Sequence, residues 1–169
     1  MPHPRYKACR RKSNFTETAP LEELDLQPTR GGCSQRSSPM VSTKYPVVAV
    51  IADDPCVLDA MTCVLPTHGF DVELYVSPGK FLEAVMMTQA SCLIVDVHLA
   101  GGCGVEFVRQ LANRGITFPV IFIGDEEAER RAMETARCVA FFRKPFSAYL
   151  LIEALYDFAD SYSTRHSGI

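Results

Sequence analysis

The stretch VVAVIADD (residues 47–54) decides the fold of this chain, because a run of small and β-branched apolar residues ends abruptly in two aspartates. Two later runs have the same form, CLIVD (92–96) and VAFFRKPF (139–146), and each also ends in charged residues. Short segments that are apolar throughout are typical of parallel sheets, whose strands are buried on both faces. The pattern therefore predicts neighbouring parallel strands that carry charges at their carboxyl ends.

Strand-like and helix-like segments alternate from Tyr45 onward. The predicted strands are 47–51, 71–75, 92–95, 119–123 and 139–142. The predicted helices, which place apolar residues on one face, are 55–66, 79–88, 103–113, 126–136 and 147–160. Five strand–helix units imply an α/β fold with an open, doubly wound parallel sheet. In such sheets the functional crevice lies outside the carboxyl ends of the strands.

The first part of the chain differs from the rest. Residues 1–44 hold eight Lys/Arg against four Asp/Glu, with scattered prolines, a Gly/Ser-rich run and no periodicity, so we predict a disordered arm. We expect one globular domain over 45–160 and a short tail over 161–169.

Bulk properties exclude several classes of protein. A net charge of −3 gives no general reason to expect binding to nucleic acid. No apolar run approaches the ~20 residues that span a bilayer, and the N-terminus lacks the apolar core of a signal peptide. The seven cysteines form no C-x-x-C pair, as in reduced thiols. We therefore expect a cytoplasmic protein that has neither a membrane nor a nucleic acid as its partner.

The charged strand ends point to phosphoryl chemistry. Asp53, Asp54, Asp96 and Lys144 should share one edge of the sheet, and such a cluster suits a hard divalent cation and a phosphoryl group. A carboxylate that attacks phosphorus forms an aspartyl phosphate, and a lysine neutralises charge on the transferred group. Any one of these residues alone fits an ordinary polar strand end, but the four together favour a phosphoacceptor site.

Residues 46–158 resemble the receiver domain of bacterial two-component response regulators, in particular the stand-alone or nitrogen-fixation-regulator-like receivers. Four features match in order: the acidic pair 53–54, D-V-x-L-x-G-x-x-G-x-E-F over 96–107, P-V-I-F-I over 119–123 and R-K-P-F over 143–146. The resemblance implies a flavodoxin-like fold, with a five-stranded parallel sheet of order 2-1-3-4-5 and helices on both faces.

The resemblance also implies roles for single residues. Asp96 would be the phosphoacceptor and Lys144 would contact the phosphoryl group. Mg²⁺ would be held by Asp96, by Asp54 directly, by Asp53 mostly through water and by the backbone carbonyl of His98. Phe141 would be the aromatic residue that rotates on activation.

The chain departs from the family after the fourth predicted strand. The family has Thr or Ser there, whose hydroxyl contacts the phosphoryl group, and this chain has Gly124. The interval from Gly124 to Lys144 is also shorter than usual by about two residues, so either Gly124 replaces the hydroxyl residue or the loop is trimmed and that residue is lost. We therefore expect the coupling between phosphorylation and Phe141 to be weakened.

Three functions compete. The first is a phosphorelay receiver without a DNA-binding output domain, which is served by a sensor histidine kinase or a histidine phosphotransfer protein. It would dock an unknown downstream protein on its 126–158 face. The second is a degenerate receiver that works as a phosphorylation-independent interaction module. The third is an aspartate-nucleophile phosphatase, but His98 stands where that class has a second catalytic aspartate, so we do not expect an enzyme.

Overall fold

The computed structural model describes residues 6–8, 45–135 and 137–166. The strands are β1 (Tyr6–Ala8), β2 (Val47–Ile51), β3 (Val72–Tyr75), β4 (Ala90–Asp96), β5 (His98–Leu99), β6 (Gly102–Cys103), β7 (Val120–Gly124) and β8 (Cys138–Arg143). The helices are α1 (Pro55–Thr67), α2 (Pro78–Ala84), α3 (Gly104–Asn113), α4 (Glu126–Met133) and α5 (Ala148–His166).

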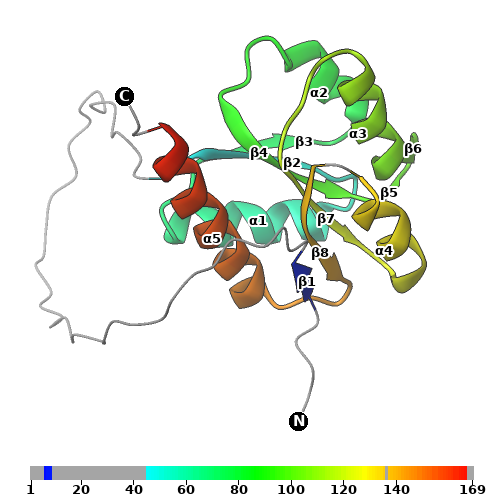
Figure 1. Cartoon of the computed structure of the whole chain (residues 1–169). Coiled ribbons are helices and arrows are strands. Elements are labelled where there is room, and N and C mark those ends of the chain that lie inside the picture. Colours follow the sequence, from blue (N-terminus) through cyan, green and yellow to red (C-terminus); the bar gives the residue numbers. More distant parts are fainter. Residues whose placement is uncertain (1–5, 9–44, 136, 167–169) are drawn as a thin grey trace, which may run out of the picture. The chain divides into compact units, whose positions relative to one another are not determined.

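The main sheet has the order β1-β8-β7-β4-β2-β3 (Figure 1). The five strands other than β1 pair in parallel. Counted from β3 to β8 and numbered along the chain, their order is 2-1-3-4-5. The predicted doubly wound parallel sheet is therefore confirmed. β4 lies at its centre, and its last residue, Asp96, pairs in register with Ile123 of β7.

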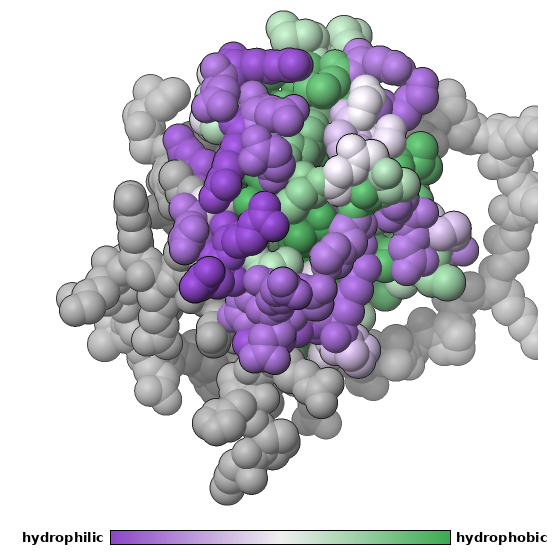
Figure 2. Space-filling view, turned by 90° about the vertical axis from the view of Figure 1, so that its right-hand side faces the viewer, coloured by the Kyte–Doolittle hydropathy of each residue, from purple (hydrophilic) through white to green (hydrophobic). Residues whose placement is uncertain are grey.

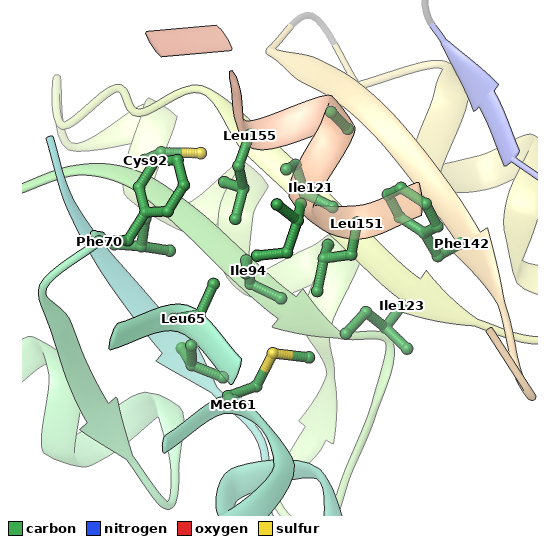
Figure 3. Close-up of a cluster of buried hydrophobic side chains, with 14 of the residues drawn as sticks. Met61, Leu65, Phe70, Cys92, Ile94, Ile121, Ile123, Phe142, Leu151 and Leu155 are labelled. Carbon is green, nitrogen blue, oxygen red and sulfur yellow. The ribbon is translucent and has the colours of Figure 1, made fainter. Parts of the chain in front are cut away.

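Side chains alternate between the two faces of the sheet and build two separate cores. Val48 and Val50 point into the cluster that α1 and α5 cover, whereas Ala49 and Ile51 point into the cluster that α2, α3 and α4 cover. Figure 3 shows the first cluster, in which side chains of both helices meet the central strands. The strands are buried on both faces, which explains their continuous apolar sequences.

Local chemistry sets where the helices begin. The carboxylate of Asp54 accepts the N–H of Cys56 at the start of α1, where Pro55 needs no hydrogen-bond partner for its nitrogen. Ser77 caps α2 and Asp125 caps α4 through the same kind of bond. One of the two aspartates after β2 thus has a structural role in addition to any chemical one.

The structure differs from the prediction at several elements. Tyr6–Ala8 forms a strand inside the segment predicted to be a disordered arm, and the rest of residues 1–44 lies outside the described residues. The loop after β4 contains a small antiparallel hairpin, β5–β6. α2 and α4 end earlier than predicted, and α5 continues to His166, beyond the predicted end at 160.

In the described part of the chain, no helix is both long and apolar enough to cross a membrane.

Candidate functional site

The carboxyl ends of β2, β4, β7 and β8 form one edge of the sheet, on the side where α4, β5 and β6 lie in Figure 1. Figure 2 looks onto this side, where hydrophilic groups surround a band of hydrophobic ones. Asp96 ends β4, Asp53 and Asp54 follow β2, and Lys144 follows β8. The predicted edge of charged residues is therefore present, and Asp96 is its most deeply placed member, with only 1% of its surface exposed.

Lys144 reaches Asp96 directly. Its ammonium nitrogen Nζ lies 2.5 Å from Oδ2 of Asp96, and the backbone N–H of His98 donates to Oδ1 at 3.0 Å. A buried carboxylate needs such partners, because an isolated charge in an apolar interior is strongly destabilised. Asp96 is thus held as a paired carboxylate with one oxygen bonded to each donor.

The backbone places Lys144 at the site. Its N–H donates to the carbonyl oxygen of Gly124 at the end of β7, over 2.8 Å. The following peptide bond, Lys144–Pro145, is cis. The side chain of Lys144 remains partly open to solvent, with 35% of its surface exposed.

Asp53 and Asp54 are engaged by neighbouring backbone groups. Oδ2 of Asp53 accepts the N–H of Ala100 at 2.6 Å, and Oδ1 of Asp54 caps α1. Across the described residues, no three Asp, Glu, His or Cys side chains are arranged as a ready metal cluster. Asp53 is bonded to the loop after β4 and Asp54 to the start of α1, and the magnesium ligands expected from the sequence remain a prediction.

The loop after Asp96 is folded tightly against it. The N–H of Gly104 donates to the carbonyl oxygen of Val97 at 2.8 Å. A Cβ atom placed on Gly104 would lie 2.1 Å from the carbonyl oxygen of Asp96. Only glycine permits this close approach. The glycine of the 96–107 motif therefore fixes the backbone of the candidate phosphoacceptor.

Gly124 lies beside Phe141, the aromatic residue that the family resemblance implies to rotate on activation. A Cβ atom on Gly124 would lie 3.2 Å from Cζ of Phe141 and 3.0 Å from Cγ2 of Val97. The ring of Phe141 is buried, with 1% of the residue exposed. The space next to residue 124 is thus filled by Val97 and Phe141, and no hydroxyl is present at this position.

The side chain of His98 has a role that the sequence did not reveal. Its Nε2 lies 2.7 Å from Oδ2 of Asp125, so the loop after β4 is linked to the loop after β7. The bond from the N–H of Ala128 and then the contact with His98 lower the pKa of Asp125. The two residues are 27 positions apart, and no local pattern connects them.

A second ion pair fixes α4 to β8. Arg143 donates from Nε to Oε2 of Glu129 at 2.6 Å, and its Nη1 lies 3.1 Å from Oε1 of Glu126. Glu129 is buried, which is rare for a glutamate unless it is paired. Arg143 and Glu129 are 14 positions apart, and no local sequence pattern connects them.

The protein-family model that describes the response regulator receiver domain matches residues 48–156. The chain belongs to this family. Receiver domains are the phosphorelay components of two-component signalling, so the family supports that class of function for this chain. The resemblance stated from the sequence is thereby confirmed.

Relatives of this receiver domain agree with the assignment. Response regulator protein TodT of Pseudomonas putida (strain F1) is 33% identical over 138 residues, which cover 76% of this chain and 60% of TodT. The solved structure titled FixJ-N is 26% identical with a TM-score of 0.61, over 68% of this chain and 94% of that one. A CheY-like receiver domain from Methanospirillum hungatei JF-1 has a TM-score of 0.63 at 18% identity, over 72% of this chain and 98% of that one, and it supports the fold. The chain spans about half to 60% of the length of the curated relatives that it matches.

Proposed function

We propose that this receiver domain accepts a phosphoryl group on Asp96 from the phosphohistidine of a sensor histidine kinase or a histidine phosphotransfer protein. The observation that carries the proposal is the pairing of Lys144 with the buried carboxylate of Asp96 at the carboxyl edge of the sheet. Phosphoryl transfer depends mainly on positioning and on neutralising charge, and this pair supplies both.

In the proposed step, a carboxylate oxygen of Asp96 attacks phosphorus. A P–O bond forms, the P–N bond to the donor imidazole breaks, and the imidazole leaves with its electron pair and takes up a proton. Before the transfer, the ammonium of Lys144 contacts Oδ2 of Asp96. After it, the ammonium would contact an oxygen of the new phosphoryl group.

Mg²⁺ fits the type of donor that this edge offers. Asp53 and Asp54 each use one carboxylate oxygen in the bonds described above, which leaves each with a second oxygen for a cation. Mg²⁺ in proteins usually takes one or two carboxylates together with water and substrate phosphate. When bound, it would neutralise charge on the transferred group, with Asp53, Asp54, Asp96 and the carbonyl of His98 as its candidate ligands.

A second candidate is a receiver that binds its partner without phosphorylation. The observation in its favour is the filled space beside Gly124, where Phe141 is already buried and no hydroxyl can draw the loop toward a phosphoryl group. Both candidates place a downstream protein on the 126–158 face and operate in the cytoplasm. Neither requires the chain to be an enzyme.

One experiment separates the two candidates. Purified protein is incubated with phosphoramidate in the presence of Mg²⁺ or EDTA. Any phosphoryl group that the protein gains is then tested with hydroxylamine, which cleaves acyl phosphates. We expect Mg²⁺-dependent, hydroxylamine-sensitive labelling in the wild type and in the matched control His98→Ala, whose backbone carbonyl is retained. Absence of labelling while Mg²⁺ binds would support the phosphorylation-independent module.

A further inference from the structure

β1 covers the outer edge of β8. Tyr6, Lys7 and Ala8 pair antiparallel with Phe142, Phe141 and Ala140, respectively. Every other pair in the main sheet is parallel. β1 is also the only described strand that comes from the segment before Tyr45. Figure 1 shows it alongside β8, in the view between α5 and α4.

Without β1, β8 would be an open sheet edge. An open edge presents a row of unpaired N–H and C=O groups and is a template for strand addition. The sequence of β8, CVAFFR, is apolar over four of its central residues and rich in strand-forming types, so the open edge would be attractive to other chains. A short strand of the same chain removes this template.

The first residues of the chain and the helices beside β8 differ in charge. Residues 1–12 contain five Lys/Arg and no Asp/Glu. The helices on either side of β8, α4 and α5, together carry six acidic residues against three arginines. In the described strand β1 only Lys7 is charged, and Glu126 and Glu129 of α4 already pair with Arg143 of β8. The backbone pairing of β1 with β8, rather than charge, therefore carries the argument.

We propose that Tyr6–Ala8 acts as an intramolecular strand that closes the edge of β8, so that a partner which adds a strand between α4 and α5 must first displace it. The occupant of the edge is thus the chain itself. Because the strand belongs to the same chain, its pairing is intramolecular, and a free partner has to compete with it. The link to a docking partner rests on the proposed function, whereas the covered edge does not.

Hydrogen–deuterium exchange of the full chain tests the proposal. Two variants, Lys7→Pro and Ala8→Pro, each place a residue without an N–H and with a fixed φ in β1. Because consecutive N–H groups of a strand point in opposite directions, one of the two variants removes a bond to β8. We expect the amides of 138–143 that face away from β7 to exchange at least about tenfold faster in that variant. The control Arg11→Pro lies outside the paired residues, loses one positive charge as Lys7→Pro does, and should exchange like the wild type.

Two results would overturn the proposal. The first is unchanged exchange of 138–143 in both proline variants. The second is protection that rises with protein concentration between about 1 and 100 μM, since a strand supplied by a second copy would behave in this way. Exchange is measured without Mg²⁺ or a phosphoryl donor. Failure of this proposal is therefore distinguishable from failure of the phosphorylation of Asp96.

Discussion

Gly104→Ala should impair both the site and the stability of the domain. The new methyl carbon would lie 2.1 Å from the carbonyl oxygen of Asp96 and 2.8 Å from Cγ1 of Val95. Ordinary van der Waals contact begins near 3.4 Å, so the Asp96 backbone or α3 has to move by roughly 1 Å. Overpacking of this kind costs about 1–3 kcal/mol of unfolding free energy. A 1 Å misplacement of a reacting group costs about 100-fold in rate.

Two measurements and one control check this prediction. Urea denaturation gives the loss of stability, and the initial rate of labelling by acetyl phosphate gives the loss of reactivity. Gly101→Ala is the matched control in the same loop, because a Cβ atom there meets nothing within 4 Å. We expect the control to stay within about 0.5 kcal/mol of the wild type. A Gly104→Ala protein that is as stable and as rapidly labelled as this control would refute the steric argument.

The remaining predictions concern packing, an ion pair and thiol reactivity. Gly124→Ala should destabilise the fold by about 1 kcal/mol in urea, since its new methyl meets neighbours at 3.0–3.2 Å; a neutral or stabilising change would contradict the filled space. Arg143→Met should lower the unfolding free energy by about 1–3 kcal/mol, because buried Glu129 loses its guanidinium donors; an unaltered urea midpoint would argue against this. Burial raises the pKa of the Cys92 thiol to about 12, so at pH 8 it should resist alkylation until the protein unfolds, while exposed Cys56 reacts. Equal native-state modification of the two, measured by peptide mass spectrometry, would disprove it.

Much of the fold was predictable because buried parallel strands leave a direct mark on the sequence. Runs such as 47–51 are apolar at every position only because both faces are covered. The short strand β1 left no such mark. Its three residues lie in a basic segment without periodicity, and their pairing is decided by the open edge of β8.

The candidate site also has a part that the sequence predicts and a part that it does not. The sequence placed Asp96 and Lys144 at one edge because each follows a predicted strand, and the structure brings their side chains together. The contact of His98 with Asp125 and that of Arg143 with Glu129 join segments far apart in the chain. Local sequence patterns do not predict these two contacts, because they depend on how the loops and α4 pack around the sheet.

The most direct test of the central claim is the intact mass of the protein after incubation with acetyl phosphate and Mg²⁺. We expect a gain of one phosphoryl group in the wild type and none in Asp96→Asn, which retains the shape of the side chain and removes the nucleophilic carboxylate. A wild-type mass that does not change, or a gain that persists in Asp96→Asn, would contradict it.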